Sequence, residues 1–534
     1  MADKPVVLMP EDIQRIMGKD AQRNNILAAR MVAEMVKTTL GPKGMDKMLV
    51  SPTNEIVITN DGATILEEMQ IEHPAAKMMV DIAKTQDSEV GDGTTSVVMI
   101  AGKLLENAER LLDKKIHPTI IAKGYKIAAE KCQEILNEIA LRISPDDDLI
   151  LKQVAMTAMT GKSAEGSKEK FAEIVVKAVK QIYHDKKVDL NDIKIEKSKG
   201  EGIADTELIS GIVLDKEKVS NDMPTVVNSA KIVLIDFPLE LKNPEIDTKI
   251  SISTPEQLQG FLNQEERTIK EMIMKVKETN ANVVFCQKGI DDFAQYLLSK
   301  AGIYACRRVA RSDMEKLAKA TGGKIVSNLS ELSSSELGNA ELVEEIKHGN
   351  DSFTYIRGCR NPKALTILIH GGTGHIIDEI ERALRDSLGV VSSSLKTGLV
   401  VPGGGAIEME LARRLRIFGQ SLSGREQLAV EEFASALEFI PSTLAENAGL
   451  DPIDVLTELK SKHDSGDKNA GLNLFNNKIE NVLEARIIEP YKIKTQAISS
   501  ATEVANMILR IDDVIASSGK KSGMKGMPQM SEFD

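Results

Sequence analysis

The first part of the chain has apolar residues near helical spacing, which predicts a run of helices. One helix is expected over residues 20–39, and it ends at Leu40-Gly41-Pro42 because glycine commonly closes a helix and proline cannot continue one. The alternating run at residues 55–59 predicts a strand, which leads into the turn Asn60-Asp61-Gly62. From that turn to about residue 142 the pattern favours helices again.

The pattern changes after a polar break at residues 144–148. A mixed region runs to about residue 215, and beyond it strands alternate with helices, as is typical of a layered α/β domain. An insertion over about 240–280 is far longer than the usual connection between a strand and a helix. Its polar loop and its charged helix with Met and Ile side chains indicate an interaction arm or a lid, or else a decoration packed on its own domain.

Amphipathic helices return after residue 371, at 375–388, 406–418 and 424–447. Because both ends of the chain are helical and the middle is α/β, we expect the two ends to close into one domain with the middle inserted into it. The tail after residue 518 is short and rich in Gly and Met, so we expect it to be disordered.

The composition is that of a globular protein, since 42% of the 534 residues are hydrophobic and 28% are charged. The net charge of −12 argues against binding to nucleic acid or to an anionic membrane, and few aromatic residues offer a surface on which bases stack. No apolar run reaches the length of a membrane span and no signal peptide is evident, so we expect a cytoplasmic protein. None of the four cysteines lies in a C-x-x-C pair, which predicts buried free thiols.

Residues 91–96 read G-D-G-T-T-S and open an apolar helical pattern. Such a turn is a favourable place for phosphate, because free backbone N–H groups and the positive end of the helix dipole lie there. Asp92 would repel a phosphate unless a divalent cation lay between them, and Mg²⁺ is commonly held by carboxylates together with phosphate oxygens. The alternative is that Asp92 only caps the helix, and the hexapeptide alone leaves both interpretations open.

Other stretches rich in glycine do not complete a known nucleotide-binding fingerprint. The T-G-K-S segment at 160–163 lacks the first glycine of a P-loop. The G-T-G at 372–374 and the G-G-G at 403–405 lack the third glycine of a dinucleotide-binding loop. Taken alone, Asp61 is most simply a turn residue and Asp386 a polar residue of an amphipathic helix.

Five stretches together resemble the chaperonin family and stand in the family's order and spacing: T-T-L-G-P-K-G-M-D-K-M-L, T-N-D-G-A-T-I-L, E-V-G-D-G-T-T-S, V-P-G-G-G-A and G-L-N-L-F. The resemblance covers nearly the whole chain. The insertion after residue 240 and the T-G-K-S segment resemble the group II branch of the family. The tail and the run E-H-P-A-A-K-M indicate the archaeal thermosomes within that branch.

The resemblance implies a mostly α-helical equatorial domain formed by both chain ends, a small α/β intermediate domain and a layered α/β apical domain with a helical protrusion. It also implies two stacked rings of eight or nine sister subunits, identical or mixed, around a cavity where non-native client proteins fold while ATP closes the cavity. The implied domains are 1–145 (equatorial), 146–215 (intermediate), 216–370 (apical, with a lid protrusion at about 240–280), 371–404 (intermediate), 405–518 (equatorial) and 519–534 (flexible tail).

The resemblance further implies roles for single residues in the binding and hydrolysis of ATP. Asp92 is implied to bind Mg²⁺, whereas Asp61 and Asp386 are implied to position or activate the attacking water and are the predicted catalytic residues. Lys162 matches a loop lysine that senses the γ-phosphate. The other implied contacts to ATP or ADP are Leu40, Gly41, Pro42, Asn60, Gly93, Thr94, Thr95, Ser96, Gly404 and Glu489.

Three functions compete at this point. The first is an ATP-dependent chaperone that encloses and folds non-native proteins. The second is a metabolic phosphotransferase that uses the same Mg·ATP cradle and works as a small oligomer. The third is a ring-forming scaffold with vestigial nucleotide binding, and the presence of Asp61, Asp92 and Asp386 argues against it, because phosphoryl transfer to water needs charge neutralisation and a positioned nucleophile.

Overall fold

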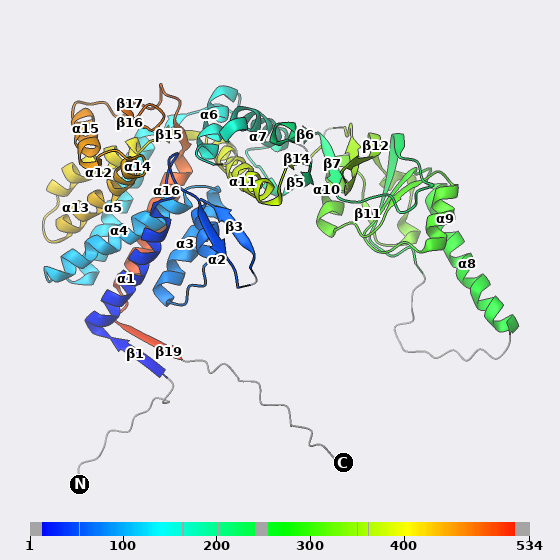
Figure 1. Ribbon diagram of the computed structural model, residues 1–534, viewed down its shortest axis with the longest axis horizontal. Helices are drawn as coiled ribbons and strands as arrows, with labels where there is room; N and C mark the ends of the chain where they lie inside the picture. Colours follow the sequence, from blue (N-terminus) through cyan, green and yellow to red (C-terminus); the bar gives the residue numbers. More distant parts are fainter. Residues whose placement is uncertain are drawn as a thin grey trace, which may run out of the picture.

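The molecule consists of three parts in a row, each with its own buried core (Figure 1). A helical part lies at one end, a small sheet with helices lies in the middle, and a larger sheet with helices lies at the other end. This arrangement confirms the prediction of a helix-rich multidomain fold with sheets. The computed structural model describes residues 13–517 except 53, 163–164, 201, 241–254, 350 and 361, so the predicted tail and the first part of the predicted insertion lie outside the described residues.

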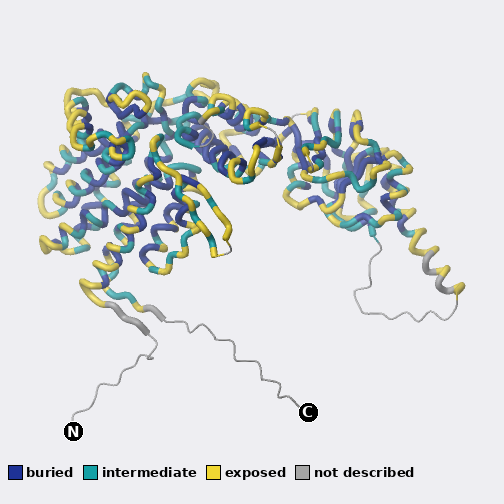
Figure 2. The backbone as a smooth tube through the Cα atoms, in the orientation of Figure 1, coloured by how far each residue is buried: buried dark blue, intermediate teal, exposed yellow. Residues whose placement is uncertain are grey.

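The helical part is built from both ends of the chain. Helix α4 (Thr94–Asp113) is buried along most of its length and packs against α1 (Gly18–Lys37) and α16 (Tyr491–Leu509) (Figure 2). One apolar core joins these helices, so residues from the first and last fifths of the chain share it. The other helices of this part are α2 (Gly62–Glu68), α3 (Pro74–Val90), α5 (Pro118–Ile139), α12 (Ala406–Gln420), α13 (Glu426–Leu437), α14 (Phe439–Asn447) and α15 (Pro452–Asp464).

Short strands complete the helical part. The strand β1 (Ile13–Met17) pairs antiparallel with β19 (Asp513–Ser517), which joins the two ends of the described chain. The hairpin β2 (Lys47–Val50) and β3 (Ile56–Thr59) extends from the body of this part (Figure 1). The remaining strands are β4 (Leu141–Arg142), β15 (Leu399–Pro402) and β18 (Ile488–Pro490), which form one sheet, and β16 (Ala470–Asn473) with β17 (Lys478–Asn481).

The middle part has a three-stranded sheet with the order β5-β14-β6, formed by Ile193–Lys199, Leu365–Gly371 and Glu207–Ile209. All residues of the central strand β14 are buried, as expected for a strand covered on both faces. Its isoleucines pack against α7 (Lys168–Ile182) and α11 (Gly374–Thr397), and α6 (Asp148–Met159) packs against both of these helices.

The far part is a seven-stranded sheet in the order β10-β9-β8-β12-β13-β7, with β11 beside β8. Side chains of β8 alternate between its two faces, so Ile232 and Leu234 pack with α10 while Val233 and Ile235 pack with α8 and α9. The bounds are β7 (Gly211–Leu214), β8 (Val226–Ile235), β9 (Val283–Cys286), β10 (Tyr304–Cys306), β11 (Ile325–Val326), β12 (Gly338–His348), β13 (Asp351–Arg357), α8 (Pro255–Glu278), α9 (Asp292–Lys300) and α10 (Arg311–Thr321).

The structure corrects one expected helix. The amphipathic stretch 424–447 forms two helices, because α13 ends at Leu437 and α14 begins at Phe439. Pro441 explains the break, since it has no N–H to donate and its ring clashes with the carbonyl four residues earlier, which is that of Leu437. A helix predicted at 375–388 is longer than expected and ends at Gly398, whose backbone is left-handed.

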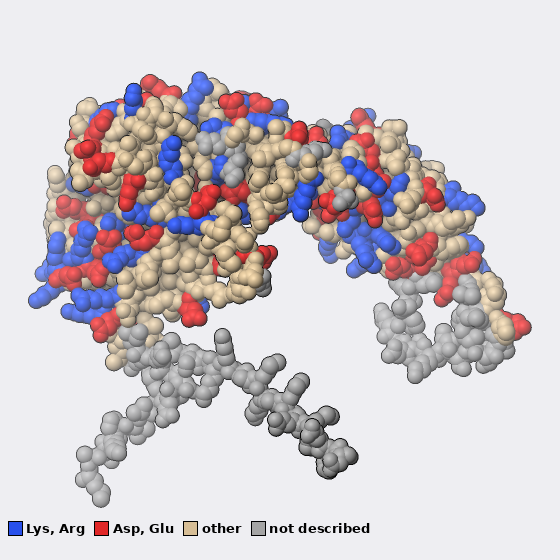
Figure 3. All heavy atoms as spheres, in the orientation of Figure 1, with Lys and Arg blue, Asp and Glu red and all other residues tan. Residues whose placement is uncertain are grey.

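Acidic and basic side chains are interspersed over most of the face shown in Figure 3. A largely uncharged stretch lies over the β2–β3 hairpin, where Met48, Val50, Ile56 and Ile58 are exposed. Contiguous apolar side chains on a surface commonly mark a contact with another protein. No helix in the described part of the chain is both long and apolar enough to span a membrane.

The close approach of α1 and α4 generates a stability prediction. A Cβ added at Gly102 would lie 2.4 Å from Ala33 Cβ, so Gly102→Ala should lower the free energy of unfolding by about 1–3 kcal/mol, the usual cost of overpacking a core. Urea denaturation followed by circular dichroism measures this change. Gly260→Ala is the matched control, because nothing lies within 4 Å of its Cβ position and alanine is the better helix former. Equal stability of the two variants would contradict the packing described here.

Candidate functional site

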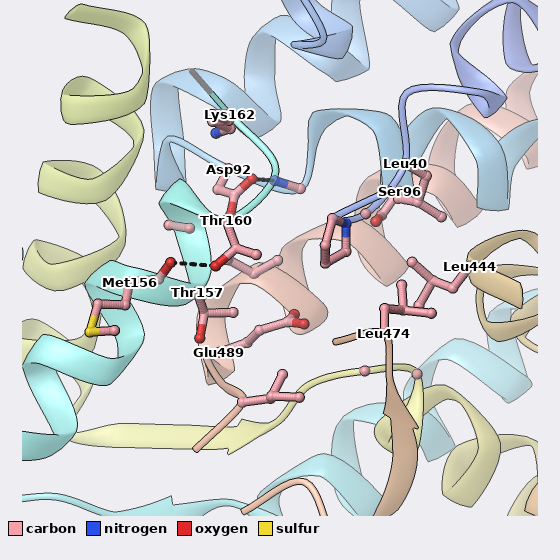
Figure 4. Close-up of a pocket in the computed structure, with 18 of the residues that line it drawn as sticks. Leu40, Asp92, Ser96, Met156, Thr157, Thr160, Lys162, Leu444, Leu474 and Glu489 are labelled. Carbon is pink, nitrogen blue, oxygen red and sulfur yellow. Dashed lines mark hydrogen bonds between the residues drawn. The ribbon is translucent and has the colours of Figure 1, made fainter. Parts of the chain in front are cut away.

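A cavity of about 520 Å³ opens between the helical part and the middle part, a volume typical of small-molecule sites. Asp92 and Lys162 lie on one side of it, Glu489 on another, and Leu40 and Ser96 across from them (Figure 4). The structure brings nearly all predicted site residues to this cavity, and Asp386 is the one that does not line it. The lining includes Leu40, Gly41, Pro42, Asn60, Asp61, Asp92, Gly93, Thr94, Thr95, Ser96, Lys162, Gly404 and Glu489.

The turn before α4 leaves the start of this helix open. Gly91 and Gly93 both have left-handed backbones, with φ of +80° and +81°, which glycine adopts without strain. Gly93 is the residue that precedes the first turn, and no side chain caps the helix there. Asp92 Oδ1 accepts a hydrogen bond of 2.7 Å from Gly93 N, so Asp92 is not the helix cap. The N–H groups at the start of α4 therefore remain available to a ligand.

Asp61 ties the turn after β3 to the start of α4. Its Oδ2 accepts hydrogen bonds of 2.8 Å from the backbone and the hydroxyl of Thr64, as in an ordinary helix cap. Its Oδ1 accepts a hydrogen bond of 2.9 Å from Thr94 Oγ1. Asp61 is thus both a cap of α2 and a carboxylate held at the cavity wall.

The loop that carries Lys162 packs on the loop that follows α1. Asn60 Nδ2 donates a hydrogen bond of 2.9 Å to the carbonyl oxygen of Gly161. The backbone of Gly161 is left-handed, and a Cβ there would lie 2.8 Å from Pro42 Cα, so a larger residue does not fit. These contacts fix the loop that carries Lys162 against Asn60 and Pro42, which both line the cavity.

Lys162 also links the cavity to α11. Its Nζ donates a hydrogen bond of 2.5 Å to Asp386 Oδ2, and both side chains are largely buried. Burial raises the pKa of Asp386 to about 8, Lys162 opposes this rise, and Asp61 and Asp92 add to it. Burial alone would lower the pKa of Lys162, but Asp386 and Asp92 outweigh burial and raise it. Lys162 therefore stays charged among several carboxylates.

A further carboxylate contributes to this negative field. Burial, and next the charges of Asp61, Glu67 and Asp92, raise the pKa of Asp87 on α3 to about 6. A site that disfavours its own negative charge to this extent attracts cations. Among the described residues, however, no three His, Cys, Asp or Glu side chains form a group that could hold a metal ion by themselves.

A buried lysine joins two glutamates at another wall of the cavity. Lys494 Nζ lies 2.8 Å from Glu408 Oε1 and 2.5 Å from Glu489 Oε2. Burial opposes the charge of Lys494, yet Glu408 and Glu489 outweigh it and raise the pKa of this lysine. Burial and the neighbouring Glu408 raise the pKa of Glu489, while Lys494 opposes them. Sequence reasoning missed Lys494 and Glu408, although a charged residue on the apolar face of a helix is a readable signal.

An aromatic contact also went unpredicted. The ring centroid of Phe475, in the loop between β16 and β17, lies 4.8 Å from Lys168 Nζ at the start of α7. Both residues line the cavity, so this contact joins the helical part to the middle part beside it. A single aromatic residue in a loop has no periodic pattern, so sequence reasoning had no signal for it.

The residues present fit a magnesium–nucleotide complex. The open N–H groups of α4 suit phosphate, and the cavity volume suits a nucleotide. The carboxylates of Asp61 and Asp92 are oxygen donors, which Mg²⁺ prefers, and this ion commonly takes the rest of its ligands from phosphate and water.

Comparisons with known proteins define the class of this chain. Residues 32–518 match the TCP-1/cpn60 chaperonin family, so the chain belongs to that family. It is 57% identical to a thermosome subunit of Methanopyrus kandleri over 96% of this chain and 95% of the relative. It is 57% identical to thermosome subunit beta of Archaeoglobus fulgidus over 99% of both chains, and 55% identical to a thermosome subunit of Pyrococcus abyssi over 100% of this chain and 98% of the relative.

Family membership confirms the main functional prediction. Chaperonins of this family are ATPases that drive protein folding, so the predicted ATP-dependent chaperone is confirmed at this level. The competing prediction of a metabolic phosphotransferase has no support from the comparisons. The group II resemblance is confirmed as well, because the relatives named here are thermosome subunits.

The Lys494 cluster generates the second prediction. Lys494→Met leaves two glutamates buried without a cation, so the free energy of unfolding should fall by about 3–5 kcal/mol. Urea denaturation followed by circular dichroism is the measurement. Lys492→Met, two residues earlier on α16, is the matched control, because Lys492 forms no ion pair within the described residues. A Lys494→Met variant as stable as this control would show that the cluster does not need its cation.

Proposed function

We propose that this chain is one subunit of a double ring that encloses non-native proteins, and that the cavity described above hydrolyses the ATP that drives closure of the ring. The observation that supports this proposal is the convergence of distant stretches on one cavity. Asp61 and Asp92 line it, and Asp386 reaches it through Lys162. These residues lie on both sides of the inserted far part of the chain.

The start of α4 is the proposed phosphate site. Its open backbone N–H groups and its dipole attract a negative group, and hydroxyls of the first turn lie beside them. The loop Leu40–Pro42, held by Gly161, forms the facing wall. The nucleotide contacts that we propose are Leu40, Gly41, Pro42, Asn60, Gly93, Thr94, Thr95, Ser96, Lys162, Gly404 and Glu489.

Asp92 is the proposed ligand of Mg²⁺. When bound, this ion supplies positive charge that offsets the phosphates and the nearby carboxylates. Gln86 fixes the backbone of Asp92, because its Nε2 donates a hydrogen bond of 2.9 Å to Asp92 O. Gly93 N holds one of its carboxylate oxygens.

Asp386 is the proposed general base, and Asp61 the residue that positions the attacking water. A general base works best when its pKa lies near the working pH, and burial places the pKa of Asp386 in that range. The proton of the water passes to a carboxylate oxygen of Asp386. Lys162 occupies one oxygen of that carboxylate, and a phosphate in the cavity competes for its ammonium group. Lys162 is thus the proposed sensor of the terminal phosphate.

Closure of the ring is proposed to complete this site. Asp386 lies on α11, whose apolar face belongs to the core of the middle part, so a rotation of that part about Gly403 would move Asp386 relative to the cavity. The charged helix α8, which extends from the far part (Figure 1), is the described portion of the proposed lid. Met274 of α8 is exposed, and so is Tyr296 of the neighbouring α9. Both side chains suit contact with apolar client segments.

The first prediction from this proposal concerns Asp386. Asp386→Ala should bind ATP with unchanged affinity and should lose about 10²–10⁴-fold in turnover, the usual contribution of a general base. Steady-state phosphate release and equilibrium binding of ATP measure the two quantities separately. Asp378→Ala is the matched control, since Asp378 stands on the same helix and pairs with Lys197 at the surface. Normal turnover by Asp386→Ala would remove Asp386 from the mechanism.

The second prediction concerns assembly. The exposed apolar side chains of the β2–β3 hairpin favour contact with a sister subunit. The purified protein should therefore appear in negative-stain electron micrographs as two stacked rings, and we propose eight or nine subunits in each. Small particles without rings would contradict the proposed enclosure of client proteins.

A further inference from the structure

Arg382 connects the β2–β3 hairpin to α11. Its Nη2 donates a hydrogen bond of 3.0 Å to the carbonyl oxygen of Ile58, the third residue of β3. The same nitrogen donates a hydrogen bond of 2.9 Å to Glu379 Oε2, and Glu379 is buried. The guanidinium group is thus fixed from its own helix and reaches across to the edge of the hairpin.

The segment after Ile58 carries the wall of the cavity. Thr59 Oγ1 accepts a hydrogen bond of 3.1 Å from Asp61 N, and Asn60 holds the backbone of Gly161. Asp61 in turn is bonded to Thr94 at the start of α4. A displacement of β3 at Ile58 would therefore reach Asp61 within three residues, through a segment in which Asn60 and Asp61 line the cavity.

Arg382 also stands one helical turn before Asp386. Residues four apart on a helix lie on the same face, so the side chain that grips β3 and the carboxylate that faces Lys162 belong to one rigid turn of α11. Arg382 is partly buried, so packing restrains its position as well, although its Nε is a buried donor with no hydrogen-bond partner among the described residues.

From this geometry we infer that Arg382 is a positioning residue for ATP hydrolysis. Arg382 sets the distance between two aspartates: Asp61, which comes just after β3, and Asp386, which comes four residues after Arg382 on α11. This inference rests on the proposed roles of those two aspartates. The hairpin exposes apolar side chains around the point that Arg382 holds, so a partner that docks on the hairpin would act on both aspartates through this one contact.

The test measures kcat and KM for ATP in the full-length assembled protein. A small misplacement of the reacting groups lowers the rate of the chemical step far more than it weakens the binding of ATP. Arg382→Ala should therefore lower kcat about tenfold and leave KM within about twofold. Both contacts of Arg382 use the single nitrogen Nη2, so the one charged donor of Arg382→Lys should recover at least about half of the lost activity on a logarithmic scale. Arg385→Ala is the matched control, because Arg385 lies on the same helix, is exposed and pairs with Glu381.

A second variant separates positioning from damage to the fold. Arg382→Ala leaves the buried carboxylate of Glu379 without its cation, which by itself destabilises α11. The double variant Glu379→Gln with Arg382→Ala removes that charge, and its kcat should stay as low as that of Arg382→Ala. Recovery of kcat in the double variant would overturn the inference, and so would an Arg382→Ala variant with the kcat of the unaltered protein.

The same assay distinguishes failure of this inference from failure of the proposed function. If Arg382→Ala is fully active while Asp386→Ala is inactive, Arg382 is not a positioning residue and the proposed site stands. If Asp386→Ala is itself active, the roles on which the inference rests are wrong, and the inference falls with them.

Discussion

Mutual repulsion of carboxylates at one cavity is the constraint on which the account depends. Burial raises the pKa of Asp386 to about 8, the charges of Asp61 and Asp92 add to this rise, and Lys162 opposes it. Within the described residues, Lys162 is the cation that touches Asp386, and it is buried with it. The cavity therefore attracts cations, because a cation that enters it weakens the repulsion between these carboxylates.

The fold holds these carboxylates close together because it joins distant parts of the chain. Asp92 stands before α4, which shares one core with α1 and α16, while Asp386 lies on a helix that shares its core with the middle part. The cavity therefore lies where two bodies with separate main cores meet, beside a smaller apolar cluster that joins them and includes Val90, Val154, Val390 and Ile493. Hydrogen bonds from Asn60 to Gly161 and from Lys162 to Asp386 join these bodies, so their relative movement changes the chemistry of the site.

Local signals in the sequence were sufficient for some features and insufficient for others. Gly91 and Gly93 indicated an open turn before a helix, because glycine adopts the left-handed backbone that such a turn needs. The amphipathic pattern around Pro441 did not indicate a break, because the pattern continues on both sides of the proline. The roles of Asp61 and Asp386 came from the family resemblance and not from patterning. Lys162 and Asp386 lie 224 residues apart, so their contact has no local signature, whereas the signal of a charged residue on an apolar helix face was present for Lys494 and was missed.

The most direct test of the central claim is a structure of the assembled protein with Mg²⁺ and a non-hydrolysable ATP analogue. The account predicts the triphosphate at the start of α4, density for a metal ion in contact with a carboxylate oxygen of Asp92, and Lys162 Nζ moved from Asp386 to a phosphate oxygen. A nucleotide bound elsewhere would contradict the account. So would a bound nucleotide with Asp92 free of metal and Lys162 still paired with Asp386.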